Sequence, residues 1–181
     1  MKTKIFLLFL VLSAGLQAQQ PEEKILWSEN LLTWEDFKSA PPPGHAFHAS
    51  ANTGLSYSWS AKILGEEVEL VYTVNSYFYP QFSWVSKKND LLLAHEQLHF
   101  DISELHARKL RMALDQFDPA KYKGLKTPLA EIYEKIEGER TSMQEQYDRE
   151  TRHSENKEAQ QLWEKKIALE LQKLKKFKAK E

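Results

Sequence analysis

The chain has 181 residues, of which 41% are hydrophobic and 12% aromatic, enough for one folded domain and too many for a largely disordered protein. Its formal net charge is -1, so no broad basic surface and no nucleic-acid partner are expected. The chain contains no cysteine, which excludes a disulfide framework, a lipid-bearing thiol and thiolate metal ligands.

The first residues have the layout of a secretory signal peptide. A short basic start precedes an apolar run over residues 5–12, and small and polar residues follow up to Ala18. The apolar run is shorter than the roughly 20 residues that a membrane-spanning helix needs. We therefore expect residues 1–18 to be a cleaved signal peptide, and an uncleaved anchor is the alternative. Residues 19–181 are then a single exported domain, periplasmic or secreted from a bacterium, with no stable membrane span after cleavage.

The next part of the chain is β-type. A short turn with Thr33 as its N-cap is followed by three prolines at 41–43, which break regular structure. Residues 54–63 alternate apolar and small polar side chains, which is typical of a half-buried strand. Residues 68–78 are rich in β-branched and aromatic side chains, and Gly65 begins a turn between the two runs. The pattern predicts an antiparallel β-hairpin.

The rest of the chain has helical periodicity. The first helix begins at about residue 89, with Asn89 or Asp90 as its cap, and extends to about Asp115. A second begins at residues 127–128 and is interrupted at 153–156, after which a third continues to about Leu174. Because strands precede helices, we expect an α+β domain: a small antiparallel β-sheet, a motif-bearing helix, and two further long helices, the last a C-terminal helical extension.

The first of these helices carries the pattern His-Glu-x-x-His. His95 and His99 are one turn and about 40° apart on a helix, so both imidazoles can bind one ion. Glu96 lies about 100° round from His95, where a carboxylate can take a proton from a zinc-activated water. The motif therefore predicts a Zn²⁺ site with Glu96 as general base. A surface pair of histidines without an ion is the alternative.

A catalytic zinc ion needs a third protein ligand. Glu104 lies on the opposite side of the helix from His95, and His106 lies about 10 Å beyond His99, so neither reaches the ion. We expect His153 to be the third ligand, because it lies where the second helix is interrupted and an antiparallel helix returns to the motif. The alternatives are a helix-end residue without a metal for His153, or a ligand among Asp148, Glu150, His45 and His48.

Three further residues in the motif helix and the second helix have expected roles. Glu104 is expected to pair with Arg108 four residues on. Asp101 either orients a ligand histidine or closes a local hydrogen-bond network. Tyr147 is either a core aromatic residue or a donor to a developing oxyanion.

Three segments resemble a bacterial domain-of-unknown-function family that is described as predicted secreted zinc-dependent proteases. They are residues 95–111 with the His-Glu-x-x-His pattern, the upstream residues 32–37, and the downstream residues 147–153. The chain departs from the family at Ser154, where glycine is common. The resemblance implies a zincin-like fold and peptidase activity.

The expected function is that of an exported zinc-dependent metallohydrolase, more specifically a peptidase. Zinc would be held by the two motif histidines and His153, and Glu96 would activate water. The partner would be a peptide or protein substrate, added as a strand along a β-edge between Tyr77 and Val85. One alternative is a non-catalytic, zinc-stabilised exported binding module, and another is an amidase of cell-wall peptides. Glu96 favours an enzyme, because a structural ion has no use for an adjacent base.

Overall fold

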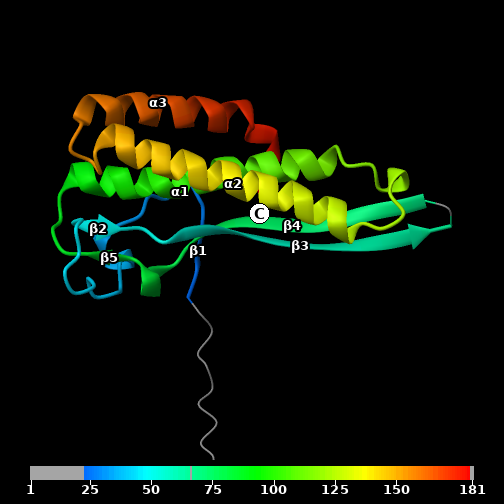
Figure 1. Ribbon diagram of the computed structural model, residues 1–181, viewed down its shortest axis with the longest axis horizontal. Helices are drawn as coiled ribbons and strands as arrows, with labels where there is room; N and C mark the ends of the chain where they lie inside the picture. Colours follow the sequence, from blue (N-terminus) through cyan, green and yellow to red (C-terminus); the bar gives the residue numbers. More distant parts are fainter. Residues whose placement is uncertain (1–22, 66, 180–181) are drawn as a thin grey trace, which may run out of the picture.

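The computed structural model describes residues 23–65 and 67–179, so the predicted signal peptide at 1–18 lies outside the described residues. The fold is α+β, as predicted, with small antiparallel sheets on one side and three long helices on the other (Figure 1). None of the helices in the described ranges is both long and apolar enough to cross a membrane.

The strands form two antiparallel sheets, and their bounds are β1 (Ile25–Leu26), β2 (Ala49–Ser50), β3 (Thr53–Leu64), β4 (Glu67–Phe78) and β5 (Trp84–Val85). The predicted hairpin is confirmed: β3 and β4 pair in register from Thr53 opposite Phe78 to Leu64 opposite Glu67. Gly65 in its turn has φ of 67°, a left-handed conformation that glycine adopts without steric cost. The first sheet has the order β1-β4-β3, and the second joins β2 to β5.

The long helices are α1 (Asp90–Asp115), α2 (Lys126–Thr151) and α3 (Lys157–Lys173), with short 3-10 turns η1 (Trp34–Asp36), η2 (Pro80–Phe82), η3 (Pro119–Lys121) and η4 (Lys175–Phe177). Of the two predicted caps, Asn89 is the one that caps α1, since its Oδ1 accepts a 2.9 Å hydrogen bond from the backbone N–H of Leu92. Asn156 caps α3 in the same way. Helix α2 begins at Lys126, just before the predicted start at 127–128.

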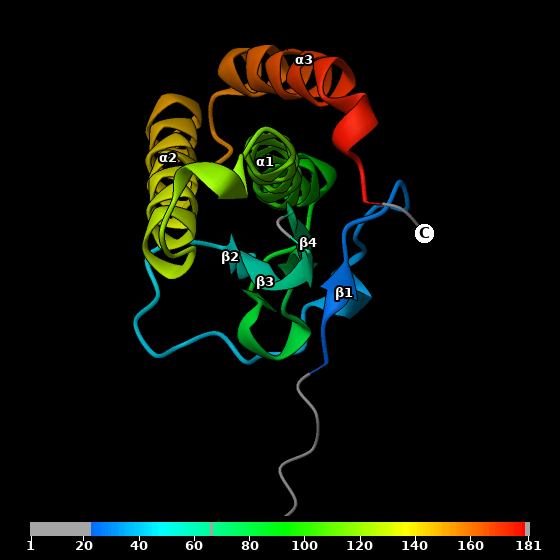
Figure 2. The same cartoon turned by 90° about the vertical axis from the view of Figure 1, so that its right-hand side faces the viewer.

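Helix α1 is the centre of the molecule. Figure 2 looks along it and shows α2 on one side, α3 on another and the sheet beneath. Its residues Ile102, Leu105, Ala107 and Leu110 are completely buried. Because other elements surround α1, its polar side chains are buried as well, and each must find a partner inside the protein.

The β-edge predicted to bind substrate is not open. Phe78 pairs with Thr53 on one side and with Ile25 on the other, so β4 is an inner strand there. Strand β5 pairs with β2, and Trp84 also bridges to Ser39. The predicted addition of a substrate strand between Tyr77 and Val85 is therefore wrong, because segments of the same chain already pair with the backbone of β4 and β5 there.

Candidate metal centre

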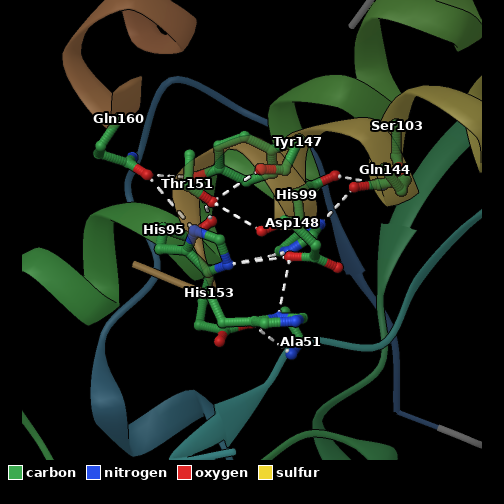
Figure 3. Close-up of polar contacts among 11 residues, drawn as sticks. Ala51, His95, His99, Ser103, Gln144, Tyr147, Asp148, Thr151, His153 and Gln160 are labelled. Carbon is green, nitrogen blue, oxygen red and sulfur yellow. Dashed lines mark hydrogen bonds and ion pairs between the residues drawn. The ribbon is translucent and has the colours of Figure 1, made fainter. Parts of the chain in front are cut away.

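Helices α1 and α2 bring three potential metal ligands together (Figure 3). Nε2 of His95 lies 3.1 Å, and Nε2 of His99 3.0 Å, from Oδ1 of Asp148. The two Nε2 atoms are 3.3 Å apart. His95, His99 and Asp148 thus form a group that could hold a metal ion.

This donor set fits zinc. Ligand atoms about 2.0–2.1 Å from one tetrahedral zinc ion lie about 3.3 Å from each other, close to the three separations observed. Two imidazoles and one carboxylate, without sulfur, also match zinc sites in which three protein ligands leave a fourth position open.

Glutamine side chains contact the other ring nitrogens. Oε1 of Gln144, from α2, contacts Nδ1 of His99, and Oε1 of Gln160, from α3, lies 3.3 Å from Nδ1 of His95 (Figure 3). An amide oxygen only accepts hydrogen bonds, so each Nδ1 carries a proton and donates it. Each Nε2 is then directed towards Asp148.

Glu96 is buried beside this group, with 3% of its surface exposed. Its Oε2 accepts a 2.7 Å hydrogen bond from the backbone N–H of Ala51, the residue after β2. Burial raises the pKa of Glu96, although the charges of His99 and His95 and the Ala51 hydrogen bond oppose that shift. A buried carboxyl group with a raised pKa beside metal ligands is a candidate general acid or base.

The histidines keep Asp148 ionised. Burial alone would raise the pKa of its carboxyl group, but hydrogen bonds from His95 and His99 and their charges hold that pKa well below the ordinary value. Burial likewise opposes the charged form of His99, yet the hydrogen bond to Asp148 and the charge of Glu96 raise the pKa of His99 overall. Asp148 can therefore act as an anionic ligand throughout the physiological pH range.

A cavity of about 440 Å³ opens beside the group. His95, Glu96 and Asp148 line it, and residues 46–50 and 152–155 form its walls. The rings of Phe47 and His153, which both line it, pack against each other with their centroids 4.0 Å apart. Two side chains of the motif, His95 and Glu96, are therefore accessible from the cavity.

The cavity wall after α2 has an unusual backbone. Arg152, His153 and Ser154 have φ values of 50°, 50° and 77°, all in the left-handed region. Each such residue costs about 1–3 kcal/mol unless its surroundings compensate, and glycine avoids the cost. Serine adopts this left-handed conformation at position 154, where glycine would avoid the cost.

The structure separates the candidates for the third ligand. Asp148 belongs to the three-donor group. His153 lies at its edge, with Nδ1 3.5 Å from Oδ1 of Asp148 and 43% of its side chain exposed, and its role as a ligand stays a prediction. Glu150 hydrogen-bonds to side chains of α2 and α3 instead. His45 contacts the backbone carbonyl of Phe47, and His48 lines the cavity outside the group.

Glu104 and His106 do not belong to the three-donor group, as the helix geometry predicted, and contact other residues instead. Oε1 of Glu104 accepts hydrogen bonds from Arg108 at 2.9 Å and from Arg111 at 3.1 Å, which confirms the predicted pairing with Arg108. Nδ1 of His106 donates to the backbone carbonyl of Ile102. Both side chains stabilise the interior around α1.

The contacts of Asp101 and Tyr147 favour one of the two interpretations given for each residue. Asp101 closes a local network by accepting hydrogen bonds from Trp27 and Gln97. Tyr147 is a completely buried core residue, stacked on the ring of His95. Its hydroxyl donates a 2.6 Å hydrogen bond to Oε1 of Gln160, so it is engaged inside the core.

Gln144 and Gln160 were missed from the sequence, because no motif marks them. A weak signal did exist for Gln160, which lies three residues before Trp163 and seven before Ile167 and so shares their apolar helix face. A polar side chain on a buried face needs a partner. The sequence could not show that the partner is His95.

The profile of one bacterial protein family matches residues 38–154, more than half of the chain. The family is described as "Bacterial protein of unknown function (DUF922)", and the matched region includes the motif, Asp148 and His153. No curated protein and no solved structure matches the chain. The match confirms membership of a bacterial family of unknown function, which the motifs had predicted, and its description assigns no activity. The chain therefore belongs to the DUF922 family of bacterial proteins.

Proposed function

We propose that this protein is an exported zinc-dependent hydrolase, more specifically a peptidase, with Glu96 as its general base. The observation that carries the proposal is the convergence of His95, His99 and Asp148 on one point beside Glu96. Zinc bound there would supply a Lewis acid that polarises a carbonyl group and lowers the pKa of water to near 7.

The protein's own residues would divide the work. The two motif histidines hold the ion with Asp148 as third ligand, which leaves the fourth position open for water. His153 is the alternative third ligand, since its Nδ1 faces the same Oδ1 atom of Asp148 from the cavity rim. The hydrogen bond from Ala51 holds Oε2 of Glu96. Oε1 of Glu96 accepts no hydrogen bond from the described residues and is the oxygen proposed to take the proton.

Proton transfer through Glu96 completes the proposed reaction. The carboxylate takes a proton from water as the oxygen of that water attacks the carbonyl carbon of an amide. The same proton then passes to the leaving nitrogen as the carbon–nitrogen bond breaks. Because burial raises the pKa of Glu96, its carboxyl group is better matched to exchanging a proton near neutral pH than an exposed glutamate.

A peptide or protein substrate suits the cavity. Its volume of about 440 Å³ lies within the about 300–1,000 Å³ typical of ligand sites. Phe47 and Leu92 supply apolar surface beside the polar floor. The choice of peptides over other amides rests on the His-Glu-x-x-His motif and on the family resemblance described above.

The test uses residues 19–181, purified and loaded with zinc. Metal analysis should find one zinc ion per chain, and mass spectrometry should detect cleavage of a mixed peptide library. Glu96→Gln should keep the zinc and lose cleavage. A chain that binds no zinc after reconstitution would refute the metal site. A zinc-loaded chain that cleaves nothing would refute the peptidase and favour the binding module.

Export is the second part of the proposal, and it rests on the basic, apolar and small-residue layout of residues 1–18. When the full chain is produced in a bacterium, the periplasmic or released fraction should contain a protein whose intact mass begins at Gln19. Full-length protein retained inside the cell would contradict it.

A further inference from the structure

Helix α3 contacts the metal centre although it lies outside the residues that the family profile matches. Its contact is Gln160, which is 1% exposed. Oε1 of Gln160 accepts a 2.6 Å hydrogen bond from the hydroxyl of Tyr147 and lies 3.3 Å from Nδ1 of His95. Figure 3 shows Gln160 reaching the site from α3, on the side of His95 away from Asp148.

The orientation of the Gln160 amide is determined by its other partner. Its Nε2 donates a 2.9 Å hydrogen bond to Oε1 of Glu164, one turn further along α3. An ionised carboxylate only accepts, so the NH₂ group must face Glu164 and the amide oxygen must face His95. Glu164 thus keeps Gln160 from flipping its amide.

This orientation decides which nitrogen of His95 is available. Facing an acceptor, Nδ1 carries a proton, and Nε2 is left to face Asp148 3.1 Å away. Gln144 does the same for His99 from α2, where its Nε2 donates a 2.9 Å hydrogen bond to the backbone carbonyl of His99. Each motif histidine is therefore held by an amide from a different helix. Both amides are neutral, so they hold the histidines without adding negative charge. Asp148 is the one carboxylate among the three donors.

We propose that Gln160 is a positioning residue of the metal centre, and that α3 is consequently part of the site. Gln160 holds His95 with Nε2 directed at the ion, and Glu164 holds Gln160. The inference rests on the metal site of the proposed function. A residue that hydrogen-bonds to a metal-binding histidine in this way typically contributes about 10–100-fold to metal affinity.

The alternative is that Gln160 only fills the core and satisfies the hydroxyl of Tyr147. Removing the amide would then loosen the packing of α3 but leave His95 as a ligand. The two interpretations differ in metal affinity and in the ligand field of the bound ion, because general packing does not set either.

The experiment compares variants of residues 19–181. Gln160→Leu removes the acceptor. If the leucine variant does not fold, Gln160→Met, which also lacks the amide oxygen, is used in its place. Zinc affinity is measured by competition with a chelator, and the ligand field by the visible absorption of the Co²⁺-loaded protein. We expect zinc affinity to fall about 10–100-fold and the cobalt spectrum to change.

An exchange variant provides the rescue. In the double variant Gln160→Glu, Glu164→Gln, the carboxylate at position 160 accepts from His95. The amide at position 164 can donate to that carboxylate, so the acceptor and the residue that holds it are both restored. Zinc affinity should return at least to that of the wild type, because a carboxylate is the stronger acceptor. Core filling predicts no recovery, since the exchange places a charge in the core.

Two controls isolate the contact. Gln161→Leu makes the same chemical change at an exposed neighbouring position. Ile167→Val loosens the packing of α3 at a buried position, in the apolar cluster that also contains Tyr147 and Trp163, and leaves the amide of Gln160 in place. Both should bind zinc as the wild type does. Equal zinc affinity of Gln160→Leu and wild type, or an equal loss in Ile167→Val, would overturn the proposal. If the wild type binds neither zinc nor cobalt, the proposed function itself fails, and this inference with it.

Discussion

The backbone N–H of Ala51 donates a 2.7 Å hydrogen bond to Oε2 of Glu96, which joins the segment after β2 to the helix that carries both motif histidines. The contact orients the proposed base. Its donor is a backbone N–H, which every residue except proline has, so the contact does not depend on the side chain at position 51. Glu96 therefore has a structural role as well as its proposed catalytic one, and different substitutions should separate the two.

Glu96→Gln and Glu96→Ala should differ in stability. Glutamine keeps an acceptor for Ala51 and removes a buried charge, so its free energy of unfolding should equal or exceed that of the wild type. Alanine leaves the N–H of Ala51 unpaired and should cost about 1–3 kcal/mol. Denaturant unfolding of the metal-free proteins measures both. Equal stability of the two variants would show that the Ala51 contact contributes nothing.

Asp148→Ala should weaken zinc binding more than His153→Ala. Asp148 lies within hydrogen-bonding distance of both motif histidines, whereas His153 is 43% exposed at the rim. Chelator competition should show a loss beyond about 100-fold for Asp148→Ala and a smaller loss for His153→Ala. Glu150→Ala is the matched control, because that carboxylate faces α3 and should leave affinity unchanged. The reverse order would make His153 the principal third ligand.

Glu104→Gln should be strongly destabilising. Oε1 of Glu104 balances the charges of Arg108 and Arg111, and all three side chains are at most 8% exposed. Removing one partner of a buried ion pair leaves uncompensated charge and typically costs about 3–5 kcal/mol. The control is Glu139→Gln, which removes a partly exposed pairing with Lys109 and should cost less than about 1 kcal/mol. Similar unfolding midpoints for both variants would contradict the expectation.

His106 should make the protein less stable in mild acid. Burial lowers the pKa of His106 to about 4 in the folded protein, against about 6.5 in an unfolded chain. As pH falls below about 6.5, the unfolded chain binds the proton first, so stability decreases until pH approaches 4 and the folded protein is protonated too. Between pH 7 and 5 the wild type should lose about 2 kcal/mol more than His106→Gln. Parallel stability profiles for the two proteins would show that His106 does not contribute.

Local sequence patterns were enough to predict the two long strands, the three long helices and two of the three potential metal ligands. Alternation at period two predicted β3, and a run of β-branched and aromatic residues predicted β4. The capping residue and apolar spacing predicted α1 within a residue of its observed start. The positions of His95 and His99 followed from helix geometry alone, because residues four apart on a helix lie on one face. The same geometry correctly excluded Glu104 and His106.

The contacts between helices could not be read from the sequence. Whether Asp148 or His153 points at the motif depends on the rotation of α2 about its axis and on the left-handed turn that follows it, and both depend on packing against α1 and α3. The open β-edge was mispredicted for a similar reason: β1 and β2 are two-residue strands, too short to leave a periodic signal, yet they occupy that edge.

By itself, then, the sequence determined the family, the α+β class and the pair of histidines with their neighbouring glutamate, since each depends on residues close together in the chain. Only the tertiary structure decided that Asp148 completes the three-donor group, that Ala51 holds Glu96, and that Gln160 lies against His95. These contacts join residues 45 to 65 positions apart, and only the burial of α1 among its neighbours brings them together.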